Sequence, residues 1–208
     1  MQCRFLTSIL LVASVLMWAS CSSMQDKADP NRLPDGRIGA SYQDFLNRSD
    51  YRDTRDVWYH DERIEKANTE NSKIVVRLGA QRGALYVNDE IAMDFPVCTG
   101  RSSYETPRGS FRIIEKVRDY RSRSYGSVYN ASGDCVNSDA TSSSPVPSGG
   151  KFVGASMPLW MRIKDGYGLH VGRVLRDADS HGCVRIPQEA CSYLFEKCGE
   201  GTRVVIED

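Results

Sequence analysis

One thiol and two imidazoles lie close together in the last third of the chain. His170 ends the run Tyr-Gly-Leu-His, and after a polar loop residues 180–185 read Ser-His-Gly-Cys-Val-Arg, which includes His181 and Cys183. A cysteine near a histidine can carry out nucleophilic acyl transfer, because the thiolate attacks a carbonyl while the imidazole takes up and returns the proton. We therefore interpret Cys183 as a candidate nucleophile, with His170 and His181 as candidate partners.

The residues around the thiol favour the same chemistry. Gly182 has no Cβ, so the backbone there can turn sharply and let a reacting carbonyl come close. The backbone N–H groups of Gly182 and Cys183 are expected to face the oxyanion that develops on that carbonyl. The thiol also lies just before a helix predicted to open at Pro187, and a helix N-terminus or a nearby imidazolium lowers the pKa of a thiol.

The elements that must position these groups are mostly strands. Short apolar runs with turn residues between them predict a β-meander at residues 74–78, 84–87 and 91–97, and Asp165-Gly166 is a hairpin-turn signal. Further strands are expected at residues 110–116, 151–153, 158–163, 167–171 and 202–206. The predicted fold class is therefore mainly β.

One convincing helix is expected near the C-terminus. Pro187 suits the first helical position, and Gly199 follows the last turn. The positions that recur at the core-facing period are Cys191, Leu194, Phe195 and Cys198. Cys191 and Cys198 are roughly 10 Å apart along such a helix, which exceeds the reach of a disulfide, so we expect both to be core residues.

Residues 119–150 carry no clear pattern. Ser, Asn, Gly and Pro dominate this stretch, which predicts a long irregular loop. A loop of this length within a domain is usually functional or mobile, so it is a candidate lid or substrate wall, with an exposed insertion as the alternative. It holds Cys135, an expected surface thiol. Whether Cys135 pairs with Cys98, which ends a predicted strand, stays open.

The N-terminus has the form of a targeting segment. Residues 1–20 have a short basic start, with Arg4, and continue into an apolar run. This run is too short for a comfortable membrane span and has the form of a secretory signal peptide. The segment ends in Trp-Ala-Ser before Cys21, which resembles the lipobox of bacterial lipoproteins and implies that Cys21 is lipidated. Ordinary cleavage near Ala19 or Ser20 is the alternative. Both interpretations export the chain.

Composition limits the remaining possibilities. The sequence has 208 residues, with 27 Lys and Arg against 27 Asp and Glu, so it offers no support for nucleic-acid binding. Residues 21–72 are polar and predict a tether and N-terminal flank, with a main domain at residues 73–208. No Cys-x-x-Cys pair occurs among the seven cysteines. A zinc site formed by His170, His181 and Cys183 is an alternative, but no fourth ligand is evident.

These motifs resemble the catalytic domain of the YkuD family, the L,D-transpeptidases. The family motif is a His, a spacer and then Ser/Thr-His-Gly-Cys-apolar-Asn/Arg, which His170, residues 171–179 and residues 180–185 match. The strand-loop-strand ahead of the site resembles residues 95–100 and 106–111, and the domain end resembles residues 201–206.

The resemblance implies a β-sandwich-like domain with one C-terminal helix and a set of roles. Cys183 would be the nucleophile and His170 the general base. The backbone N–H groups of His181, Gly182 and Cys183 would line the oxyanion hole. Ser180 and Arg185 would shape the pocket, and Arg185 would be available to pair with a substrate carboxylate.

The implied reaction takes place on peptidoglycan stem peptides in the periplasm or cell envelope, with no metal or cofactor. The thiolate attacks a tetrapeptide stem, releases D-alanine and leaves a thioester. An amine of a neighbouring stem then forms a 3→3 crosslink, or a related attachment. A lipid on Cys21 would anchor the enzyme to the membrane. Hydrolysis of stem peptides by an L,D-carboxypeptidase-type reaction is one alternative, and a non-catalytic wall-binding lipoprotein is another.

Overall fold

The computed structural model describes residues 41–208 of the chain. The predicted signal peptide, the lipidation site Cys21 and the first part of the tether lie outside the described residues. In the described part, strands form one sheet of six strands and one of five, and three helices accompany them. The prediction of a mainly β fold with a C-terminal helix is confirmed.

No helix in residues 41–208 is both long enough and apolar enough to pass through a bilayer.

The six-stranded sheet contains the predicted meander. Its spatial order is β1-β4-β3-β2-β11-β5, and β2, β3 and β4 pair antiparallel in succession. Asn88 and Asp89 both have positive φ in the tight turn between β3 and β4, as a primed hairpin turn requires. The bounds are β1 (Trp58–Tyr59), β2 (Ser72–Arg77), β3 (Arg82–Val87), β4 (Glu90–Pro96), β5 (Gly109–Arg112) and β11 (Arg203–Glu207).

The five-stranded sheet carries the residues with candidate chemistry. Its order is β10-β9-β8-β6-β7, and β9 and β10 run parallel, which sets His170 beside Arg185 across the ladder. The predicted turn between β8 and β9 is confirmed, with Asp165 at φ 43°. The bounds are β6 (Glu115–Tyr129), β7 (Cys135–Thr141), β8 (Lys151–Lys164), β9 (Tyr167–Val171) and β10 (Val184–Ile186).

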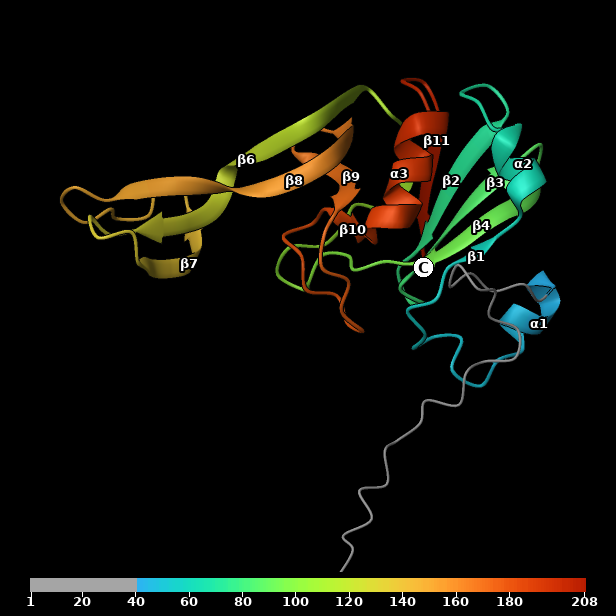
Figure 1. Cartoon of the computed structure of the whole chain (residues 1–208), viewed down its shortest axis with the longest axis horizontal. Helices are drawn as coiled ribbons and strands as arrows, with labels where there is room; N and C mark the ends of the chain where they lie inside the picture. Colours follow the sequence, from blue (N-terminus) through green and yellow to red (C-terminus); the bar gives the residue numbers. More distant parts are fainter. Residues whose placement is uncertain (1–40) are drawn as a thin grey trace, which may run out of the picture. The chain divides into compact units, whose positions relative to one another are not determined.

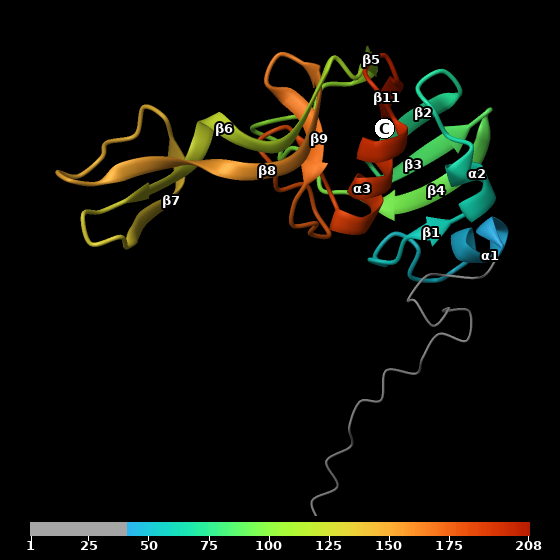
Figure 2. The same cartoon turned by 45° about the horizontal axis from the view of Figure 1, so that its top comes forward.

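The helix α3 (Gln188–Lys197) joins the two sheets. Figures 1 and 2 show it between β11 of one sheet and β9 of the other, and its buried face belongs to the same apolar cluster as both sheets. Cys191 and Cys198 are both fully buried free thiols, so their predicted core role is confirmed. Pro187 is the N-cap rather than the first helical residue, a shift of the size usual at helix ends.

The prediction of an irregular loop at residues 119–150 is wrong. The strand β6 continues to Tyr129, and β7 pairs with it, so this stretch forms a β-arm that extends from the five-stranded sheet (Figure 1). Most side chains of β7 are exposed. A ribbon that faces water on both sides needs no apolar alternation, so the sequence signal on which strand prediction depends is missing. Cys135 is exposed in β7 and free, as is the buried Cys98, so the two form no disulfide.

A buried ion pair ties the N-terminal flank to the six-stranded sheet. Arg82 on β3 and Asp94 on β4 are almost fully buried, with 2.6 Å between guanidinium nitrogen and carboxylate oxygen. The hydroxyls of Tyr42 and Tyr51 each donate to the other Asp94 oxygen at 2.8 Å. Burial and this carboxylate raise the pKa of Tyr51 to about 12. The short helices α1 (Tyr42–Leu46) and α2 (Asp61–Glu65) complete the flank.

We predict that Arg82→Met lowers the free energy of unfolding by about 3–5 kcal/mol, because it leaves a buried carboxylate without its cation. Urea denaturation measures this change. The matched control is Lys197→Met, which removes a pair with the exposed Glu65 and should cost less than about 1 kcal/mol. Equal effects of the two substitutions would contradict the role of burial.

Candidate active site

Residues 98–100 hold the Ser-His-Gly-Cys segment through backbone hydrogen bonds. Cys98 and Arg185 exchange N–H···O bonds of 3.0 and 2.9 Å, and the Thr99 carbonyl accepts from the N–H groups of Asp179 and Ser180. Gly100 makes a parallel bridge with Ser180. The strand and loop at residues 95–100 therefore align the segment that bears the thiol.

Two hydroxyls fix the turn before the thiol. The Thr106 hydroxyl accepts from the Gly100 N–H and donates to the Gly182 carbonyl, both at 2.8 Å. The Ser180 hydroxyl accepts from the Gly182 N–H at 3.0 Å and donates to the Cys183 carbonyl at 2.6 Å. Each hydroxyl therefore joins two backbone groups that would otherwise be unpaired near the site.

This turn changes the expected oxyanion hole. The Gly182 N–H, predicted to face the oxyanion, is already bonded to Ser180. Within the described residues, the backbone N–H groups of His181 and Cys183 donate to no protein group, so they are the two that remain. Gly182 itself has φ 103°, and a Cβ there would lie 2.6 Å from the Tyr167 ring, so the position requires glycine.

Cys183 is half-buried at the end of this turn. The expectation that it lies at a helix N-terminus is wrong, because β10 separates it from α3. Burial raises the pKa of the Cys183 thiol, while a hydrogen bond from the Gly168 backbone and the charge of Arg185 act in the opposite direction. The structure therefore presents a protonated thiol at neutral pH, one that needs a base to remove its proton.

His170 has the properties of such a base. It is 6 % exposed on β9, and its Nδ1 lies 2.8 Å from the Val171 carbonyl oxygen. A carbonyl only accepts, so Nδ1 carries the hydrogen and Nε2 of the neutral ring is free to take a proton. Burial, helped by the charge of Arg185, lowers the pKa of His170 to about 4. The ring is consequently neutral at physiological pH.

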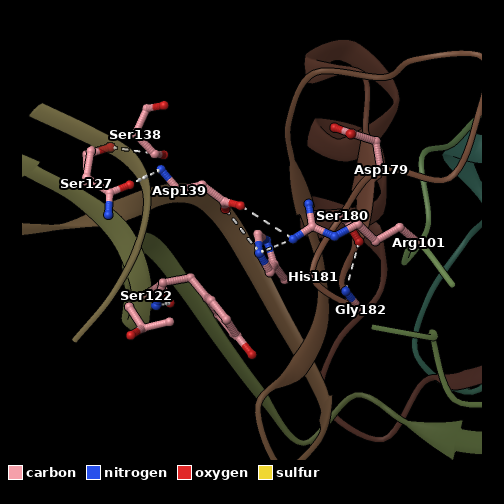
Figure 3. Close-up of polar contacts among 12 residues, drawn as sticks. Arg101, Ser122, Ser127, Ser138, Asp139, Asp179, Ser180, His181 and Gly182 are labelled. Carbon is pink, nitrogen blue, oxygen red and sulfur yellow. Dashed lines mark hydrogen bonds and ion pairs between the residues drawn. The ribbon is translucent and has the colours of Figure 1, made fainter. Parts of the chain in front are cut away.

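His181 is held by the β-arm and by the loop after Gly100. Its Nε2 is 3.0 Å from an Arg101 nitrogen and 3.2 Å from an Asp139 oxygen, and Figure 3 shows both contacts meeting at this one ring nitrogen. The ring stacks on Tyr125 at 4.5 Å, and Tyr104 meets it edge-on at 4.6 Å. Burial and Arg101 lower the pKa of His181. These contacts orient the side chain toward the arm.

A pocket of about 240 Å³ brings the predicted site residues together. The predicted residues that line it are His170, Ser180, His181, Cys183 and Arg185. The arm contributes Ser122 and Tyr125, so part of the segment predicted to be a loop does form a wall of this pocket. Larger hollows of about 710 and 620 Å³ contain neither His170 nor Cys183.

Two arginines line the pocket, and they differ in whether an acidic side chain pairs with them. Arg185 is paired with Asp179 at 3.1 Å, so the charge that was expected to meet a substrate carboxylate already has a partner. Arg173 is exposed, and in the described residues its side chain makes no hydrogen bond or ion pair. Sequence reasoning missed Arg173 because it lies in the spacer, where no motif singles it out.

The described residues do not support the zinc alternative. Between residues 41 and 208, no cluster of three or more His, Cys, Asp and Glu side chains is arranged to hold a metal ion. His170 and His181 instead make the contacts given above, with a carbonyl and with Arg101 and Asp139.

Comparison with known proteins assigns the family. The L,D-transpeptidase catalytic domain, YkuD, matches residues 71–206. Because this match covers most of the chain, the chain belongs to the YkuD L,D-transpeptidase catalytic domain family. No curated protein sequence matches the chain significantly.

Solved structures share the fold. An L,D-transpeptidase from Mycobacterium smegmatis is 16 % identical with a TM-score of 0.51, over 66 % of this chain and 59 % of that one. L,D-transpeptidase 3 from Mycobacterium tuberculosis, in complex with a faropenem-derived adduct, is 17 % identical with a TM-score of 0.50, over 66 % and 60 %. The match thus spans about three fifths of these relatives.

We predict that His170 makes stability depend on pH. Its pKa is 6.5 when exposed and about 4 in the fold, so the unfolded chain binds the proton more readily between these values. At pH values well above 6.5, His170 is neutral in both states and does not lower the free energy of unfolding. As the pH drops toward 4 this free energy falls, with about 2 kcal/mol lost between pH 7 and 5. Urea denaturation across this range should show a shallower loss for His170→Gln. Equal slopes in the two proteins would contradict a neutral, buried His170.

Proposed function

We propose that this chain is a peptidoglycan L,D-transpeptidase with Cys183 as its nucleophile. The observation that carries the proposal is the presence in one pocket of a thiol and a buried, neutral imidazole with a free Nε2. The family match supports the reaction class. The neutral imidazole is the form that can accept the thiol proton.

The first half of the reaction forms a thioester. His170 takes the proton of Cys183, and the thiolate attacks the carbonyl that precedes the terminal D-residue of a tetrapeptide stem. The backbone N–H groups of His181 and Cys183 donate to the oxyanion of the tetrahedral intermediate. As the carbon–nitrogen bond breaks, His170 returns its proton to the leaving amine, and D-alanine departs.

The second half transfers the acyl group. The amine of a neighbouring stem attacks the thioester, the carbon–sulfur bond breaks, and the amine proton passes through His170 to the thiolate. The product is a 3→3 crosslink. Water as the acceptor would give hydrolysis instead, and the acceptor therefore decides between the transferase and the carboxypeptidase outcome.

The proposed place of action is the cell envelope. The predicted export signal at residues 1–20 would take the chain across the inner membrane. Stem peptides are found on the outer side of that membrane. A lipid on Cys21 would hold the enzyme at a membrane, and the polar residues after it would serve as a tether. This arrangement agrees with a substrate that is itself a large immobile polymer.

We predict that Cys183→Ala abolishes acylation by a stem tetrapeptide and by a carbapenem, an inhibitor class typical of the family. Intact-mass measurement detects the adduct on the purified protein. The matched control is Cys135→Ala, which removes an exposed thiol that does not line the pocket and should leave acylation unchanged. An adduct that persists on the Cys183→Ala protein would show that another group is the nucleophile.

The choice of acceptor is tested in the cell wall. We expect sacculi from cells with the intact gene to contain more 3→3 dimers than sacculi from cells that produce the Cys183→Ala protein. Mass spectrometry of digested sacculi counts these dimers. If dimers are equal while tetrapeptide stems accumulate only with the variant, the protein is a hydrolase of stem peptides rather than a transpeptidase.

A further inference from the structure

The pocket around Cys183 has one cation without a counter-ion. None of the Asp and Glu residues between positions 41 and 208 lines it, and His170 is neutral. Arg185 is held by Asp179 at 3.1 Å. Arg173 lines the same pocket, is exposed and, in the part of the chain that the structure describes, makes no side-chain hydrogen bond or ion pair. An anionic ligand is therefore favoured in this pocket, and Arg173 is the cation that is free to meet it.

The backbone at this arginine is firmly placed. Gly172, directly after β9, donates its N–H to the Ile186 carbonyl at 3.1 Å. A Cβ at Gly172 would lie 2.8 Å from the Arg185 side chain, so the two segments are in close contact. The base of Arg173 is thus fixed three residues from His170, while its guanidinium stays unengaged. A fixed base lowers the entropy that is lost when the side chain binds a ligand.

We propose that Arg173 binds a carboxylate of the stem peptide and thereby selects for stems that carry it. This inference rests on the proposed function and adds a recognition role for a residue outside the family motif. A guanidinium forms two parallel hydrogen bonds with a carboxylate, which gives both affinity and orientation. Two stem carboxylates are available: the one on the terminal D-residue, and the side-chain carboxylate of a diamino dicarboxylic acid.

Binding to the unreactive protein tests the proposal without requiring turnover. Calorimetry on the full chain with Cys183→Ala measures Kd for a stem tetrapeptide, and adding Arg173→Gln should raise Kd about tenfold or more, because the charge-assisted contact with the carboxylate is lost. The matched control is Arg176→Gln, three residues along the same loop. Arg176 is exposed, lies 3.7 Å from Asp53 and does not line the pocket, so Kd should stay the same.

Amidated peptides identify the carboxylate. One peptide is amidated at the terminal D-residue and another at the side-chain carboxylate. The peptide that lacks the group bound by Arg173 should bind the Cys183→Ala protein about tenfold more weakly, with no further loss on Arg173→Gln. Additive losses for both peptides, or an unchanged Kd for Arg173→Gln, would overturn the proposal.

The two proposals fail in different ways. If the wild-type protein forms an acyl-enzyme and Arg173→Gln forms it equally well at low peptide concentration, only the role of Arg173 is wrong. If the Cys183→Ala protein binds no stem peptide and the wild-type protein forms no adduct, both the function and the recognition role are overturned.

Discussion

The hydrogen bonds between residues 98–106 and 179–185 are the constraint on which the candidate site depends. Both segments consist mainly of polar residues and glycine, which offer little apolar surface to fix a loop by burial. Backbone bonds from Cys98 and Thr99, with the two bonds of the Thr106 hydroxyl, do so instead. A site must hold its groups to a fraction of an ångström, and a loop tied at several backbone atoms can meet that demand. The position of Cys183 is therefore set by a segment some 80 residues earlier in the chain.

Burial then favours the neutral form of both the proposed nucleophile and the proposed base. The same low-polarity surroundings lower the pKa of His170 and raise that of the Cys183 thiol, because in each case the charged form is the one that loses water. Both groups are therefore neutral at rest, and in the proposed reaction charge would develop only when the thiol attacks. Arg185 adds to this effect at His170 and opposes it at Cys183, so it favours a thiolate over an imidazolium.

The β-arm contacts the candidate site although few of its own side chains are buried. Most of β7 is exposed, yet Asp139 reaches His181 (Figure 3), and Tyr125 on β6 stacks on the same ring. The arm thus forms one wall of the pocket while contributing little buried apolar area. Its contacts with the site are polar and aromatic.

The sequence by itself determined the family, the strands of the meander, the C-terminal helix and five of the residues that line the pocket, because an apolar period and a compact motif are local signals. Only the tertiary structure showed that the Gly182 N–H donates to the Ser180 hydroxyl, that β10 separates Cys183 from the helix, and that much of residues 119–150 forms strands. It also distinguished Arg173 from Arg185. These outcomes depend on which polar groups become partners across the fold, and partnership between distant residues leaves no periodic trace in a single sequence.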